Sequence, residues 1–245
     1  MTVSVLPELL HRGIAIFILS LGIGILAMHT YLVTLTAQHS TLGVWRRFLV
    51  AALVGAYLTI WLSVAIIIGD RTNFPMTREG LRLPISLLIG FGPMFLGIAI
   101  LFASKTMRHI NGAMPLPWLI WAQTYRVGGL IFLYPFLYYG LLPAAFSVPA
   151  SLGDFVTGLL APFVGFAVAS RRSHAIRWAI VWNAFGVLDL ILAPIAAVLS
   201  QARLIGLYPL SLVPLFIGPP MGILVHVYSI RNLAVNSVSG KQVVS

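Results

Sequence analysis

The sequence contains seven long apolar stretches separated by short polar segments, and this pattern constrains the fold more than any other feature. A helix that crosses a membrane needs about 20 mainly apolar residues. Seven stretches meet this requirement, at about residues 14–36, 48–69, 84–104, 118–139, 153–169, 177–200 and 209–230, and the fifth is the shortest. The pattern predicts a single all-α transmembrane domain over residues 1–245, a polytopic integral membrane protein with seven transmembrane helices.

The composition supports this class. Hydrophobic residues make up 60% of the chain and charged residues only 8%, whereas average soluble domains are about 25% charged. The net charge of +10 does not indicate a nucleic acid partner, because the cations lie mostly in short loops beside apolar stretches. There they act as topology signals and contact membrane lipids. Cysteine is absent, which excludes disulfides, thiolate metal ligands and a cysteine nucleophile.

Seven spans place the two termini on opposite sides of the membrane. Loops rich in Lys and Arg stay on the cytoplasmic side, and the two sides differ in these residues. We therefore expect the N-terminus outside and the C-terminus in the cytoplasm, across the cell membrane or, in a bacterium, the inner membrane. The proposed inner side holds Arg46, Arg47, Lys105, Arg108, Arg171, Arg172, Arg177, Arg231 and Lys241, and the outer side holds Arg12, Arg71, Arg78, Arg82 and Arg203.

The fourth stretch, WLIWAQTYRVGGLIFLYPFLYY, contains an arginine, Arg126. Together with Asp154 and Asp189, Arg126 is one of three charged residues within the spans or at their edges. Each costs about 2.5–3.5 kcal/mol to insert, so such residues face the bundle interior and seek partners. At about 1.5 Å per residue, Arg126 and Asp189 lie about 12 and 18 Å from the inner boundary, which makes Asp189 the expected partner. Asp154 falls roughly 26 Å from that boundary, so we expect it on the outer side as the next candidate.

Other polar residues in the spans extend this candidate site. Gln123 lies one turn before Arg126, and His226 has a similar depth, whereas Asn183 is turned about 120° from Asp189 around its helix. We predict a buried, hydrated polar site lined by Gln123, Arg126, Asn183, Asp189 and His226. In this hypothesis Arg126 binds an anionic group or holds Asp189 ionised, and Asp189 or His226 relays a proton. The alternative is a buried ion pair that fixes helix register, with the amides as hydrogen-bonding contacts between helices.

Two proline-containing segments predict irregular backbone. The apolar segment Gly140–Asp154 contains Pro143 and Pro149, and we interpret it as a surface turn, an interfacial hairpin or a re-entrant loop. The last stretch contains four prolines, which predict a kinked helix whose freed carbonyls line a cavity or are satisfied by neighbouring helices. These are Pro209, Pro214, Pro219 and Pro220.

No motif identifies a cofactor or a reaction. Retinal is excluded because the last span lacks a lysine, the only lysines being Lys105 and Lys241. Paired-histidine haem sites and zinc motifs are missing, so we expect neither a cofactor nor a bound metal. The leading hypothesis is a non-enzymatic protein that binds or transports a small solute or ion. The alternatives are a non-catalytic subunit or scaffold of a larger complex, with a protein partner or as a homo-oligomer, and an intramembrane enzyme acting on a lipid or isoprenoid.

Overall fold

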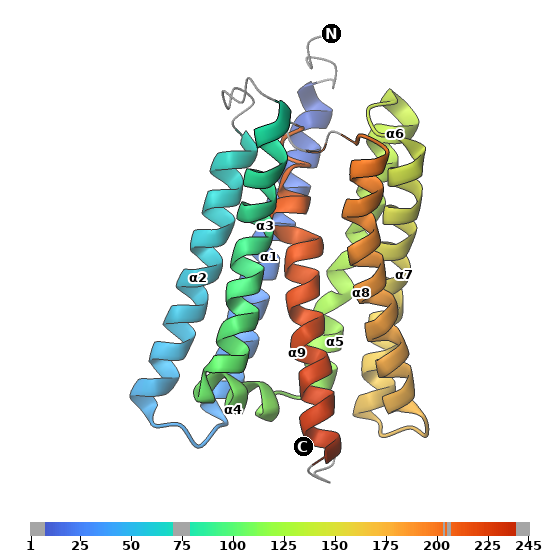
Figure 1. Ribbon diagram of the computed structural model, residues 1–245. Helices are drawn as coiled ribbons and strands as arrows, with labels where there is room; N and C mark the ends of the chain where they lie inside the picture. Colours follow the sequence, from blue (N-terminus) through green and yellow to red (C-terminus); the bar gives the residue numbers. More distant parts are fainter. Residues whose placement is uncertain (1–7, 71–78, 203, 205–206, 239–245) are drawn as a thin grey trace.

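The computed structural model describes residues 8–70, 79–202, 204 and 207–238 as an assembly of helices (Figure 1). No strand occurs in these residues, which confirms the all-α prediction for this part of the chain. The long helices are α1 (Glu8–Gln38), α2 (Val44–Asp70), α3 (Glu79–Ala103), α7 (Ala144–Ala169), α8 (Ala175–Leu199) and α9 (Pro219–Val238). They run side by side along one axis (Figure 1).

Five described segments are long and apolar enough to cross a membrane: Arg12–Gln38, Val44–Gly69, Ala144–Ala169, Ala175–Leu199 and Val213–Asn236. A sixth is obtained if α3 and the short helix α4 (Lys105–Ala113), which meet at an angle of 90°, count as one broken span. The bend lies at Ser104, whose side chain caps α4 by accepting a hydrogen bond from the amide of Met107 at 3.3 Å. The structure thus supports a multi-pass membrane protein, while the count of seven spans stays a prediction.

The fourth predicted span is built from shorter helices. These are α5 (Leu116–Trp121), the 3₁₀ helix η1 (Ala122–Phe132) and α6 (Leu133–Tyr139). Long 3₁₀ segments are uncommon and often mark a functional hinge or a sequence under strain. Here η1 lies so close to α7 that a Cβ atom at Gly158 would overlap the backbone of Val127. Helix α6 ends at Gly140, whose φ of 59° is a left-handed conformation that glycine adopts without strain.

The fifth helix begins earlier than the sequence pattern indicated. Helix α7 starts at Ala144 rather than near residue 153, and it contains both Pro149 and Pro162. The interpretation of Gly140–Asp154 as a hairpin or re-entrant loop is therefore wrong for residues 144–154. Prolines are tolerated inside transmembrane helices because neighbouring groups satisfy the freed carbonyls, so Pro149 was a misleading signal. Asp154 now lies about 15 Å inside α7 rather than at its edge.

Helix α9 occupies the centre of the bundle, where it contacts α3, α4, α5 and α8. A short π-helix, η2 (Val213–Ile217), precedes it. The helical backbone is interrupted at Gly218, and α9 begins at Pro219. Proline suits a first helical position because its missing amide hydrogen would be unpaired there. The predicted irregularity of the last span is thus located at this junction, and most of the span is buried in the bundle.

Most of the described basic residues lie in segments at one end of the bundle. The α1–α2 connection, α4, the α7–α8 connection and the end of α9 all lie at that end (Figure 1). The start of α1 and the α6–α7 turn lie at the opposite end. This arrangement agrees with the predicted separation of charge, although the orientation across a membrane stays a prediction. Four of the counted cations lie outside the described residues: Arg71, Arg78, Arg203 and Lys241.

Candidate functional site

Arg126 lies at the centre of a buried cluster that joins four helical segments. From η1, its Nε donates to Asp154 Oδ1 on α7 at 2.7 Å, and its Nη2 donates to Asp189 Oδ2 on α8 at 2.5 Å. Its Nη1 donates to His226 Nε2 on α9 at 3.1 Å. The side chain of Arg126 is only 1% exposed. A guanidinium is a donor only and presents its N–H groups in a rigid fork, so the three partners fix its orientation.

Both aspartates contact this arginine. The structure places Asp189 beside Arg126, and it also places Asp154 there instead of in the outer connection to which its depth had assigned it. The reason is the earlier start of α7, which moves Asp154 into the middle of its helix. Because α7 and α8 pack against each other, the two carboxylates face the arginine from adjacent helices.

The hydrogen bonds of His226 define which of its two ring nitrogens carries a hydrogen. Since Arg126 only donates, Nε2 of the ring must accept, and Nδ1 therefore carries the hydrogen. Nδ1 donates to Asn183 Oδ1 at 2.9 Å. The amide of Asn183 in turn donates to Ala179 O at 2.8 Å and to Ser229 Oγ at 3.1 Å. His226 is thus a neutral imidazole held between the arginine and an amide, and the ring is fully buried.

The structure separates Gln123 from this chain of contacts. Its Nε2 donates to the carbonyl of Gly222 on α9 at 3.0 Å. Its Oε1 is buried and has no hydrogen-bond partner among the described residues. Of the five side chains that the sequence suggested, four are connected through hydrogen bonds, namely Arg126, Asp189, His226 and Asn183. Gln123 lies on the same helical segment as Arg126 and instead ties η1 to α9.

Glycines on the neighbouring helices leave space for the side chains of the cluster. A Cβ atom at Gly153 would overlap the carboxylate of Asp189, and one at Gly186 would overlap the ring of His226. Small residues at such positions let membrane helices approach closely. Gly153 was not among the predicted site residues, although its position directly before Asp154 was a usable signal.

Trp182 supports the same cluster from α8. Its ring centroid lies 4.9 Å from that of His226, and its Nε1 donates to the carbonyl of Thr157 on α7 at 3.0 Å. Trp182 could not be predicted from the sequence, because an aromatic side chain within an apolar span carries no distinguishing signal. Its contacts hold α7, α8 and α9 together around the imidazole.

The cluster has an imbalance of formal charge. One guanidinium faces two carboxylates, and the imidazole is neutral, so two ionised aspartates would leave one negative charge unmatched. Such a charge is costly in a low-dielectric interior. Each carboxylate also keeps one oxygen outside its ion pair with Arg126, and the aspartate side chains are 13% and 12% exposed. The arrangement can therefore take up one proton or one small cation. Among the described residues, no group of three His, Asp or Glu side chains is placed to hold a metal ion.

Comparison with known proteins identifies a family. A model of the family described as Domain of unknown function (DUF8737) matches residues 82–234, which is more than half of the 245-residue chain. The chain belongs to this family. The DUF8737 region extends from within α3 into α9 and includes every residue of the Arg126 cluster. No curated protein and no solved structure matches the chain, so the comparisons assign no activity.

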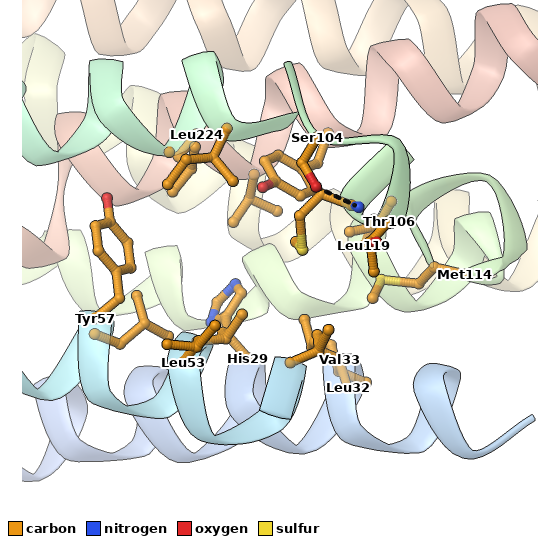
Figure 2. A pocket seen from close by; sticks show the side chains of 18 of the residues that line it. His29, Leu32, Val33, Leu53, Tyr57, Ser104, Thr106, Met114, Leu119 and Leu224 are labelled. Carbon is orange, nitrogen blue, oxygen red and sulfur yellow. Dashed lines mark hydrogen bonds between the residues drawn. The ribbon is translucent and has the colours of Figure 1, made fainter. Parts of the chain in front are cut away.

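A separate cavity of about 580 Å³ lies on the other side of α9. Within the DUF8737 region, Met221, Leu224 and Val225 of α9 line this cavity, whereas His226 faces Arg126. The opposite wall comes from α1 and α2, which precede the DUF8737 match. Helix α9 therefore lies between the charged cluster and an apolar cavity, whose lining side chains are drawn in Figure 2.

Proposed function

We propose that the protein is a multi-pass membrane transporter in which the cluster of Asp154, Arg126 and Asp189 binds and releases a proton as a small solute or ion crosses the membrane. The observation that supports this most strongly is the bridging of two carboxylates by one arginine inside an apolar bundle. Ionisable residues within membrane spans are costly, and they mark ion pathways and proton relays in pumps and transporters.

The proposal includes the topology expected from the sequence. The Leu116–Tyr139 segment and the bent α3–α4 pair would complete seven spans. The start of α1 would lie outside and the end of α9 in the cytoplasm, because cytoplasmic loops carry an excess of Lys and Arg. The gathering of basic segments at one end of the bundle supports this orientation.

A proton is the simplest ligand that balances the cluster. One positive charge neutralises one carboxylate, and a shared proton would neutralise the other without requiring a coordination shell. Two carboxyl groups that share a site do not ionise together readily, because their charges repel. The partial exposure of the two aspartate side chains would let a proton reach them. His226 and Asn183 act as positioning residues, since they fix the third side of the guanidinium.

A second candidate function follows from the same hydrogen bonds. Nε, Nη1 and Nη2 of Arg126 each have a partner within the protein. A cluster closed in this way also suits a scaffold or non-catalytic subunit, in which the charges only fix helix register. Replacement of a carboxylate by an amide distinguishes the two functions. Proton-coupled transport requires a side chain that can gain and lose a proton. A scaffold requires only a side chain of the same shape that makes the same hydrogen bonds.

The test is proton movement by the purified protein in liposomes. A pH-sensitive dye is trapped inside, and a membrane potential is imposed with potassium and valinomycin. We expect internal pH to change faster than in protein-free liposomes, and we expect Asp154→Asn and Asp189→Asn each to remove this difference. Arg177→Gln, an exposed change at the basic end, is the matched control and should leave the flux intact. Equal flux in the wild type and both asparagine variants would contradict the proposal and favour the scaffold.

A further inference from the structure

The apolar cavity between α1, α2, α3, α4 and α9 has the properties of a binding site that is independent of the charged cluster (Figure 2). Its volume of about 580 Å³ falls within the range of about 300–1,000 Å³ typical of small-molecule sites. Aliphatic and thioether side chains dominate its wall. Representative lining residues are Leu32, Val33, Leu53, Met114, Leu119 and Leu224. A wall of this kind suits an alkyl chain.

The cavity is elongated and reaches the side of the bundle. Along α2 it extends from Arg46 to Tyr57, which is about 16 Å at about 1.5 Å per residue. Leu49 and Leu53 line it and are also 42% and 60% exposed. The cavity therefore borders the lateral surface of the bundle, which faces lipid in a membrane protein. A chain can enter from the bilayer without crossing an aqueous phase.

Cationic residues mark the part of the cavity that lies at the basic end of the bundle. Arg46 and Thr106 line both this cavity and an adjoining hollow, whose wall also contains Lys105 and His109. The five acidic residues of the chain all lie elsewhere: Glu8, Asp70 and Glu79 at the far ends of their helices, and Asp154 and Asp189 in the Arg126 cluster. The positive charge at this end is thus complementary to an anion. Basic pockets between transmembrane helices on the cytoplasmic side are suited to anionic lipid headgroups.

Deeper in the bundle, away from Arg46, the polarity of the cavity wall is opposite. His29 points into the chamber from α1 (Figure 2), and its Nδ1 donates to the carbonyl of Ile25 at 2.7 Å. Nε2 therefore presents a lone pair, which is buried and has no hydrogen-bond partner among the described residues. A phosphate or carboxylate oxygen also carries lone pairs and would be repelled there. An amphiphile must accordingly place its anionic group at Arg46 and its chain toward His29.

We propose that this cavity binds an anionic membrane phospholipid. One acyl chain lies along α2 between Arg46 and Tyr57, and the phosphate contacts Arg46 and Lys105. The second chain remains in the bilayer beside the exposed Leu49 and Leu53. This inference does not depend on the proposed transport function, because the site lies on the opposite side of α9 from the Arg126 cluster.

Native mass spectrometry of the delipidated full-length protein tests the proposal. The protein is incubated with phosphatidylglycerol and phosphatidylcholine of identical acyl chains in equal amounts. We expect one phosphatidylglycerol to be retained per protein, with a preference of about tenfold or more over phosphatidylcholine. Phosphatidylglycerol is anionic beside the two cations, whereas the choline group of phosphatidylcholine neutralises its phosphate. The double variant Arg46→Gln/Lys105→Gln should lose this preference. The double variant Arg172→Gln/Arg177→Gln removes two exposed charges at the same end, away from the cavity, and should keep it.

Two further arms examine the cavity itself. Leu53→Trp and, separately, Val54→Phe add side-chain volume to its wall and should release the bound lipid. Gel filtration confirms that each variant remains folded, and two variants are used so that one folding failure does not end the test. Equal retention of the two lipids by the wild type would overturn the proposal. Unchanged retention in a folded cavity variant would do so too, as would displacement of phosphatidylglycerol by an equal concentration of oleate, which would identify a fatty acid site instead.

Discussion

Arg126 on η1 donates to Asp189 on α8 at 2.5 Å, across 63 residues of sequence. The same guanidinium donates to Asp154 on α7 at 2.7 Å, so a single side chain bridges the helices of the α7–α8 hairpin. The cluster is a structural junction and, in our proposal, the group that exchanges a proton. These two roles lead to separate predictions.

Removal of Arg126 alone should be more damaging than its removal together with Asp189. Arg126→Gln leaves two buried carboxylates without their cation, and we expect it to lower the free energy of unfolding by about 3–5 kcal/mol. Asp189→Asn in the same protein removes one of those carboxylates and should recover part of this loss. Thermal unfolding in detergent of the wild type, both single variants and the double variant measures the coupling. Strictly additive losses would show that the two side chains do not interact.

The close approach of α8 to α9 should depend on Gly186. A methyl group at this position would overlap the His226 ring, and we expect Gly186→Ala to lower the free energy of unfolding by about 1–3 kcal/mol. Gly24→Ala in α1 is the matched control, because its Cβ would meet no atom within 4 Å. This control should be neutral or stabilising by about 0.5–1 kcal/mol. The same thermal assay serves both, and an equal response at the two positions would argue against the packing described here.

The hydrogen bonds of His226 predict one particular tautomer. The ring should be neutral, with its hydrogen on Nδ1 and a free lone pair on Nε2 that accepts from Arg126. Nitrogen NMR of protein labelled on histidine distinguishes the two ring nitrogens, and loss of the signal in His226→Gln assigns it. A hydrogen on Nε2, or a doubly protonated ring, would be incompatible with the contact to Arg126. Asn183→Leu, which removes the partner of Nδ1, should alter this signal.

The orientation of the bundle can be tested with single cysteines, because the chain has none of its own. Ala144→Cys lies at the start of α7, and Ser173→Cys lies in the α7–α8 connection at the opposite end, with both positions exposed. A thiol reagent that cannot cross the membrane should label Ala144→Cys in intact cells. It should label Ser173→Cys only after the membrane is opened. The reverse pattern would place the basic end outside.

The general architecture was accessible from the sequence because lipid imposes a simple requirement, a long apolar helix. Hydropathy located α2, α3 and α8 to within a few residues, whereas α1 begins earlier than predicted and the last predicted span, about 209–230, overlaps only part of α9 (Pro219–Val238). The depth of a residue in the membrane follows from the constant rise per residue of a helix. This rise placed Asp189 within about one helical turn of the depth of Arg126. Both inferences depend only on local geometry.

The remaining features depend on contacts between distant segments. Pro149 suggested a break that neighbouring helices prevent, so the start of α7 and the position of Asp154 were misjudged. The 3₁₀ geometry of η1 and the 90° bend after α3 leave no hydropathy signal. The apolar cavity is lined by residues from α1, α2, α3, α4 and α9, and no single segment reveals it. These features arise from packing between helices, which the hydropathy pattern of the sequence does not predict.

The most direct test of the central claim is infrared difference spectroscopy of the purified protein as the pH is raised. If the Arg126 cluster exchanges a proton, the C=O band of one protonated carboxyl group should disappear over this titration in the wild type. Asp154→Asn and Asp189→Asn should each abolish that change, because either leaves a single carboxylate balanced by Arg126. A wild-type spectrum without any protonated carboxyl across the pH range in which the protein is folded would contradict the account, and the cluster would then be a structural ion pair.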